Sequence, residues 1–112
     1  KQDRKDRIFQ SFIFSLSQNF RTHHSVSFYA AEQCLTPRYF STIVREKSGR
    51  NALQWIMMFI IAEAKKLLSD PDPSIKEIAE TLGFSNQSFF GRYFKQYVGL
   101  SPMAFRSSGA EE

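Results

Sequence analysis

The chain has 112 residues, the size of one ordinary domain or of two very small subdomains that share a core. With 42% hydrophobic residues and 12 Phe, it lacks the low hydrophobicity that is typical of disordered chains. The net charge of +4 and the pI near 9.4 suit a polyanionic partner, and residues 81–110 contain bases but no Asp or Glu.

Cysteine content and hydropathy exclude several classes of protein. Cys34 is the only cysteine, so it has no partner for an internal disulfide, and no Cys/His spacing suits zinc. The longest apolar run, residues 55–62, is far shorter than the roughly 20 residues that span a bilayer. We therefore expect a cytoplasmic protein without metal or cofactor. Because the chain begins at Lys1 without Met, we also expect a fragment of a longer protein.

Residues 4–22 are predicted to form an amphipathic helix, because apolar side chains recur there at three-to-four-residue spacing. These side chains are Ile8, Phe9, Phe12, Ile13, Leu16 and Phe20. Residues 27–34 then predict a short helix, which is followed by a tight turn at Leu35 and Thr36.

Thr36 and Pro37 together predict a helix start, since Thr caps free amides and Pro is favoured at the first helical position. This helix is expected to end at residue 47 or 48, before Gly49. A long helix over residues 52–68 follows. It is apolar around much of its circumference, so we expect it to be packed on several sides.

Residues 69–73 contain two prolines and interrupt the helical pattern. Ser74 and Glu77 have the spacing of a capping box and predict the next helix, which runs to Leu82 and ends at Gly83.

Two more helices complete the predicted chain. Ser85 or Asn86 caps a helix that runs to about Tyr97, and residues 101–107 form a last short helix. No strand pattern appears, so the sequence predicts an all-α fold of about seven helices.

Residues 30–49 are similar to residues 79–99. At an offset of 49, Ala30, Cys34, Leu35 and Thr36 match Ala79, Gly83, Phe84 and Ser85. At an offset of 50, Phe40, Arg45, Lys47 and Gly49 match Phe90, Lys95, Tyr97 and Gly99, so the second copy has one extra residue at its turn. Each copy is a short helix, a turn and a longer helix, the plan of a helix-turn-helix unit.

The longer helix of each copy has a polar face opposite an apolar one. The apolar faces hold Phe40, Ile43 and Val44, and Phe90, Tyr93 and Phe94. The polar faces hold Arg38, Ser41, Thr42 and Arg45, and Ser88, Gly91, Arg92 and Lys95, with Gln87 beside them. Arg pairs with guanine, Gln with adenine, and Ser or Thr with bases or phosphates. A solvated face is the alternative, but two unrelated solvated faces would not need matching positions.

A helix of ~17 residues between the copies would be about 25 Å long, and successive major grooves of DNA lie about 34 Å apart. One chain could therefore read two adjacent grooves. The predicted organisation is an N-terminal helical region at 1–25 that packs on the first subdomain, a first unit at 26–50, a linker helix at 51–69, a second unit at 74–107 and a disordered tail at 108–112.

Residues 26–106 resemble the DNA-binding domain of the AraC/XylS family of bacterial transcription regulators. The second copy carries the most specific match, which consists of Ile78-Ala79, Gly83-Phe84, Ser88, Phe90, Arg92, Phe94-Lys95, Gly99, Ser101-Pro102 and Arg106. The resemblance implies a homeodomain-like fold of two helix-turn-helix subdomains joined by a long linker helix. Each subdomain would place one helix in the major groove, so that the protein activates or represses promoters.

By this resemblance, the base-reading positions are Arg38, Ser41 and Thr42 in the first unit and Gln87, Ser88, Gly91 and Arg92 in the second. Phosphate contacts are expected from Thr36, Arg45, Ser85, Asn86 and Lys95. The implied partners are double-stranded promoter DNA, RNA polymerase in that context, and a sensory or receiver domain outside this chain, through which a dimer can form.

The first copy departs from the family pattern. Thr42 stands where many relatives carry Arg, Val44 where Phe is common, Cys34 at the turn Gly and Ile60 where Arg is frequent. We therefore hypothesise tighter sequence reading by the second unit.

Some residues admit a second interpretation. His23 and His24 are expected to lie in a polar loop rather than a metal site, because adjacent His side chains converge poorly. Cys34 is expected to be a small core residue rather than a redox sensor, since no nearby base favours its thiolate.

The long helix and the first helix also allow two roles. Trp55, Met57, Met58 and Ile60 are expected to be core, with a partner surface as the alternative. The first helix is expected to pack on the first unit, and it can also lead in from a missing domain.

No paired carboxylates, Ser/His/Asp set or Gly-rich phosphate loop is present, so we expect no enzymatic activity. The alternatives to DNA reading are a helix-turn-helix scaffold for protein contacts and a fragment of a DNA-repair methyltransferase, for which Cys34 lacks the reactive setting.

Overall fold

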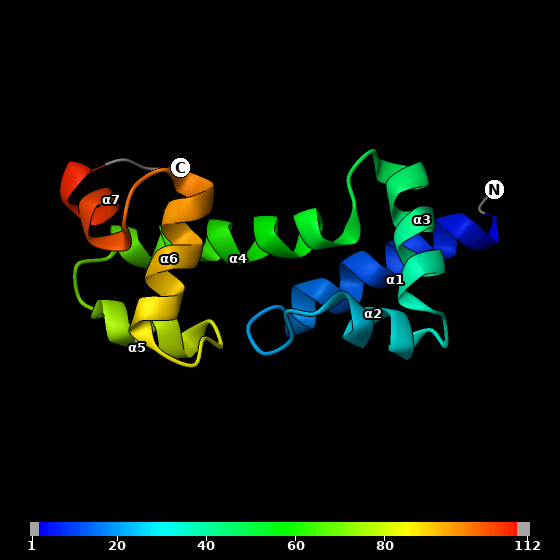
Figure 1. Cartoon of the computed structure of the whole chain (residues 1–112), viewed down its shortest axis with the longest axis horizontal. Coiled ribbons are helices and arrows are strands. Elements are labelled where there is room, and N and C mark those ends of the chain that lie inside the picture. Colours follow the sequence, from blue (N-terminus) through cyan, green and yellow to red (C-terminus); the bar gives the residue numbers. More distant parts are fainter. Residues whose placement is uncertain (1–2, 110–112) are drawn as a thin grey trace. The chain divides into compact units, whose positions relative to one another are not determined.

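The computed structural model describes residues 3–109, and all regular structure within them is α-helical (Figure 1). The helices in this range are α1 (Arg4–Asn19), α2 (Val26–Glu32), α3 (Pro37–Ser48), α4 (Ala52–Ser69), α5 (Ile75–Thr81), α6 (Gln87–Val98) and α7 (Pro102–Ser108). The prediction of an all-α fold with about seven helices is confirmed.

Several helix ends differ from the predicted ones by one to three residues. The first helix was expected to reach Thr22 but ends at Asn19, whose carbonyl accepts from the backbone N–H groups of Thr22 and His23 at 3.0 and 2.9 Å. These bonds tighten the last turn and end the helix. Ser108 and Gly109, which we assigned to a tail, are the last residue and the cap of α7. Residues 110–112 lie outside the described residues.

The chain divides into two compact units, Lys1–Phe59 and Ile60–Glu112. The boundary falls inside α4, so the helix that we expected to be a separate linker contributes its first half to one unit and its second half to the other.

The first unit packs α1 against the predicted helix-turn-helix. The ring of Phe12 is fully buried and meets the rings of Tyr29 and Phe40 edge-on, with centroid separations of 5.5 and 5.1 Å. Trp55 meets Phe9 edge-on, and its indole N–H donates to Ser48 Oγ at 2.8 Å. α1 therefore contributes Phe9 and Phe12 to the packing of the first unit.

The second unit has a continuous aromatic core. Phe90 contacts Phe84 and Phe94, and Phe94 contacts Phe105 of α7 at centroid separations between 5.2 and 5.9 Å. Arg106 donates from Nε to the carbonyl of Leu68 at 3.1 Å and from Nη2 to that of Asp70 at 2.9 Å. Arg106 therefore ties α7 to the end of α4, where carbonyls have no helical partner.

The internal repeat extends beyond the two helix-turn-helix segments. The buried residues of α1 are Ile8, Phe12 and Leu16, and those of the second half of α4 are Ile60, Ala64 and Leu68, at a constant offset of 52. The first half of α4 likewise matches α7, because Ala52 and Pro102 are both buried first residues of a helix, at an offset of 50. Each unit is therefore a helix, a helix-turn-helix and a closing helix.

Burial along α4 is narrower than the sequence indicated. Its fully buried residues form one stripe at four-residue spacing, namely Ala52, Ile56, Ile60, Ala64 and Leu68. Ile60 is core as expected, whereas Trp55, Met57 and Met58 are half-buried. Leu53, near the start of the same helix, is exposed. Each unit contains one half of α4 and buries the part of the stripe that lies on that half.

Ion pairs reinforce the packing of α1 on α3. Lys47 Nζ lies 2.7 Å from Asp6 Oδ1, and Lys5 Nζ lies 3.0 Å from Glu46 Oε1. The hydrogen bond from Lys47 holds the pKa of Asp6 below its usual value of 3.8, and the bond to Asp6 raises the pKa of Lys47 above 10.5.

We predict that Asp6→Asn removes a pH-dependent part of the stability of the first unit. A carboxyl with a lowered folded pKa contributes stability above pH 3.8 that is lost as the pH falls through the folded value. Lys47, with a raised pKa, contributes below pH 10.5 and loses its contribution as the pH rises. The melting temperature, measured across pH, should fall less steeply toward both pH extremes in Asp6→Asn than in wild type. Asp72→Asn, in an exposed turn, is the control, and an equal change in both variants would contradict the assignment.

Candidate nucleic-acid interface

Both units turn between their two central helices through one residue in the left-handed conformation. Cys34 has φ 59° and Gly83 has φ 83°. The next residue, Leu35 or Phe84, donates its backbone N–H to the carbonyl of Ala30 or Ala79, at 3.0 Å in both units. The matching geometry agrees with the repeat that the sequence indicated at an offset of 49.

The prediction that Cys34 is a small core residue is wrong, since its side chain is exposed. The left-handed backbone turns the chain so that Leu35 and Phe84, rather than the residues before them, approach the core; Leu35 is half-buried and Phe84 buried. Cys34 thus occupies a turn position that favours Gly.

The caps locate the extra residue of the second unit. Thr36 Oγ1 accepts from the N–H of Tyr39 at 3.2 Å, and Asn86 Oδ1 accepts from that of Phe89 at 2.8 Å. Asn86 rather than Ser85 therefore caps α6. Thr36 corresponds to Asn86, and Ser85 is the inserted residue between Phe84 and the cap.

The predicted apolar faces of α3 and α6 lie inside the units. Five of their six side chains are buried, and Tyr93 is half-buried. On the opposite faces, Arg38, Thr42, Arg45, Gln87, Ser88, Arg92 and Lys95 are exposed, while Ser41 and Gly91 are half-buried. The structure therefore brings the predicted base-reading residues of each unit together on one accessible helix face.

In the first unit, Thr42 has a backbone hydrogen bond. Its hydroxyl donates to the carbonyl of Arg38 at 3.0 Å, one helical turn earlier. The hydroxyl proton is therefore engaged within the helix, and the side chain presents an acceptor and a methyl group to a ligand.

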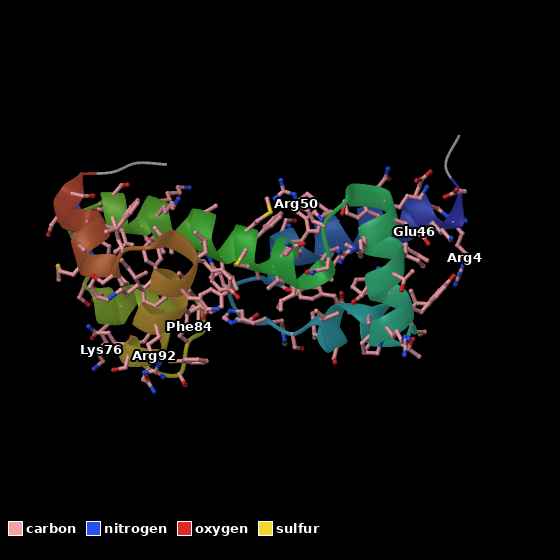
Figure 2. The ribbon with its side chains drawn as sticks, turned by 45° about the horizontal axis from the view of Figure 1, so that its top comes forward. Arg4, Glu46, Arg50, Lys76, Phe84 and Arg92 are labelled. Carbon is pink, nitrogen blue, oxygen red and sulfur yellow. The ribbon has the colours of Figure 1, made fainter. Side chains whose placement is uncertain are left out.

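In the second unit, Arg92 has an aromatic partner that the sequence analysis missed. Its guanidinium carbon lies 5.8 Å from the ring centroid of Phe89, which is 48% exposed. Tyr39, at the matching position of α3, is 42% exposed. Both aromatics fall outside the apolar face and occupy matching places in the repeat, and this match was the signal in the sequence that could have drawn attention to them. Figure 2 shows Arg92 projecting from the second unit, with Lys76 at the same edge of this unit in that view.

A hollow of about 340 Å³ lies where α5 meets the start of α6. It is lined by Lys76, Ala79, Glu80, Ser85, Asn86, Gln87 and Ser88. Four of these residues were predicted DNA contacts, and Lys76 adds a cation near free helix-start amides, which attract anions. Glu80 places one opposing charge in the same hollow.

The histidines lie in a loop, as expected. The ring of His23 stacks on Phe28 with a centroid separation of 3.7 Å and an interplanar angle of 3°. Over residues 3–109, no group of three or more His, Cys, Asp or Glu side chains is placed to hold a metal ion. In the same range, no helix has both the length and the apolar character that crossing a membrane requires.

Comparison with known proteins gives the family. A model described as a helix-turn-helix domain matches residues 29–108. The arabinose operon regulatory protein of Escherichia coli K12 is 37% identical over 83 residues, which are 74% of this chain and 28% of that protein. The chain belongs to the AraC-type helix-turn-helix family.

Solved structures agree with the fold of this AraC-type domain. The C-terminal domain of AraT, a response regulator from Geobacillus stearothermophilus, has a TM-score of 0.85 at 23% identity, over 95% of this chain and 88% of that one. The DNA-binding domain of AdpA, solved in complex with a target DNA, has a TM-score of 0.76 at 26% identity and covers 90% of each chain. The resemblance and the homeodomain-like fold predicted from the sequence are confirmed.

The AraC-type domain spans less than a third of the length of the arabinose operon regulatory proteins that it matches.

We predict that Cys34→Gly stabilises the first unit. A non-Gly residue in the left-handed region costs about 1–2 kcal/mol, and the greater freedom of Gly in the unfolded chain offsets about 0.4–1 kcal/mol of the gain. The free energy of unfolding measured by urea denaturation should therefore rise by up to about 1.6 kcal/mol. The reverse change, Gly83→Ala, should lower it. A loss of stability in Cys34→Gly would contradict the strain at this turn.

We predict that Gly91→Ala stabilises the free domain. Gly91 lies inside α6, and a Cβ there would meet no atom within 4 Å. Ala in a helix interior is about 0.5–1 kcal/mol better than Gly, so the free energy of unfolding should rise by about that amount. Gly99→Ala is the matched control, because this site is equally open but has φ +93°, and it should lose stability. The same sign in both variants would contradict the prediction.

Proposed function

We propose that this domain binds double-stranded DNA in a sequence-specific manner and serves as the output part of a transcription regulator. The observation that carries the proposal is the repeated helix face, on which polar residues at matching positions of α3 and α6 are accessible while the opposite faces are buried. The solved AdpA complex with a target DNA and the arabinose operon relatives support it.

The proposed DNA contacts are of two kinds: contacts to base edges, which read the sequence, and contacts to phosphates, which position the domain. Arg38, Ser41 and Thr42 of α3, and Gln87, Ser88, Gly91 and Arg92 of α6, would face base edges. Thr36, Arg45, Ser85, Asn86 and Lys95 would contact phosphates. Asn86 uses its oxygen to cap α6, which leaves its amide N–H groups as phosphate donors. Each unit would enter one major groove, and the two grooves would be adjacent.

Gly91 is half-buried on this face, and no contact within the domain requires Gly at this position. Since no atom of the domain lies near a Cβ at this position, we attribute the Gly to close approach of a base pair to the helix backbone. Gly91→Ala should therefore weaken DNA binding although it stabilises the free domain.

The wider setting is part of the same proposal. The full-length protein would be a cytoplasmic regulator without catalytic activity, with a sensory or receiver domain outside this chain and RNA polymerase as a partner at promoters. A dimer would form through the sensory or receiver domain.

The proposal is tested by selecting duplexes from a random pool with the purified domain and measuring their affinity by fluorescence anisotropy. The selected duplex should bind at least about 10³-fold tighter than a scrambled duplex of equal composition. Both affinities should fall as salt rises from about 50 to about 200 mM, since Lys and Arg neutralise phosphates. A domain that enriches no sequence and shows no salt-dependent binding would instead be a protein-contact scaffold.

We predict that Arg92→Ala reduces the preference of the domain for its selected bases more than Arg38→Ala does. The guanidinium of Arg92 lies beside the ring of Phe89. In the first unit, the matching residue is Thr42, whose hydroxyl proton is already donated to the carbonyl of Arg38. Loss of a bidentate guanine contact costs about 1–3 kcal/mol and relaxes preference at one base pair.

Lys95→Ala is the control for this comparison. Because Lys95 is proposed to contact a phosphate, Lys95→Ala should weaken binding to selected and scrambled duplexes alike and reduce the salt slope by about 1. Equal losses of base preference in Arg92→Ala and Arg38→Ala would show that the two units read DNA equally.

A further inference from the structure

Phe89 is an exposed aromatic in the first turn of α6, where burial does not explain it. Nearly half of its side-chain surface is accessible, whereas the next residue, Phe90, is fully buried. Gln87 and Ser88, which precede it in the same turn, are proposed DNA contacts. Its ring lies under Arg92, so Phe89 borders the proposed reading face.

The ring of Phe89 is supported from the core. Phe84, buried beside the left-handed turn, meets Phe89 edge-on at 6.0 Å and also contacts Phe90 and Tyr93 at 5.2 and 5.1 Å. On its other side, Phe89 lies under the guanidinium of Arg92, 5.8 Å from its centroid. The rings thus form a continuous path from the core of the second unit to the cation at its surface.

The first unit has no equivalent of this pair. The residues that match Phe84, Phe89 and Arg92 are Leu35, Tyr39 and Thr42, and the hydroxyl of Thr42 bonds to the backbone instead. An aromatic that supports a cation in the reading face is therefore specific to the second unit.

We propose that Phe89 and Arg92 act as one reading element that recognises a guanine with a thymine beside it; this rests on the proposed DNA-binding function. A cation held over an aromatic face is restricted in orientation, so Arg92 meets guanine O6 and N7 with fewer alternative conformations. The remaining exposed surface of Phe89 is apolar. In the major groove, the apolar group on a base is the thymine methyl. Phe89 is thus a positioning residue for Arg92 and a contact for the neighbouring base.

The test uses the selected duplex with two atomic substitutions. 7-Deazaguanine removes the N7 acceptor of each guanine in turn, and deoxyuridine removes the methyl group of each thymine. Wild type should lose about 5- to 100-fold affinity at one guanine. At a thymine next to it, wild type should lose about 4-fold, the value of one buried methyl group.

The Phe89 variants separate the two roles of the ring. Phe89→Ala should lose the deoxyuridine effect and about 2- to 5-fold of the guanine preference, which corresponds to an exposed cation–π pair. Phe89→Tyr, which keeps a ring, should retain both effects. Phe89→Leu should keep the deoxyuridine effect only, and since Leu is an ordinary exposed helix residue it guards against a folding defect in the Ala variant.

Coupling is measured with Arg92→Ala and the double variant Phe89→Ala/Arg92→Ala. On the duplex that carries deoxyuridine at the neighbouring thymine, where the methyl contact is already absent, the double variant should bind about as weakly as Arg92→Ala, rather than showing the product of the two losses. Phe14→Ala is the control, because it removes an exposed aromatic of α1 that lies outside both reading faces and should leave both base effects unchanged.

Two results would overturn the inference alone: multiplicative losses in the double variant, or a wild-type domain that is insensitive to every deoxyuridine. Failure of wild type to enrich any duplex would overturn the proposed function and, with it, this reading element.

Discussion

Burial of one phenylalanine in each recognition helix fixes which residues the domain presents to its surroundings. Phe40 and Phe90 are both fully buried at the fourth residue of α3 and α6. Because side chains of a helix point in fixed directions 100° apart, burying this residue sets the rotation of the helix about its axis. Arg38 and Ser88, two residues earlier, must then face outward. The reading faces are thus consequences of core packing, and the polar residues on them are free to differ between units.

The two cores are small, and α4 serves both of them. Its buried stripe contributes Ala52 and Ile56 to the first unit and Ile60, Ala64 and Leu68 to the second. In the first unit, α1 takes the place that the second half of α4 takes in the second unit. This arrangement explains why the buried stripe runs along the whole of α4. It also explains why α1, which lies outside the matched helix-turn-helix, is needed to bury Phe40.

Much of this organisation could be predicted from the sequence, because periodicity, caps and the repeat all act locally. The buried faces of α3 and α6 and the start at Thr36 follow from spacing alone. What could not be predicted depends on neighbours distant in sequence or on backbone angles. Exposure of Cys34 follows from its left-handed φ, and the bond from Arg106 to Leu68 spans 38 residues. Phe89 falls outside the apolar spacing of α6, so that spacing gives no sign of its pairing with Arg92.

The central claim is that the two units share the same arrangement of helices and that a few surface residues determine which bases each unit recognises. The most direct test transfers the reading face of the second unit to the first through Pro37→Gln, Arg38→Ser, Tyr39→Phe, Ser41→Gly and Thr42→Arg. Sequences selected from a random duplex pool are then compared with those of wild type, and Arg92→Ala identifies the base pairs read by the second unit. The account predicts that the first half of the selected site acquires the base pairs of the second half. A first half that keeps its original bases, or that no longer shows any preference, would contradict it.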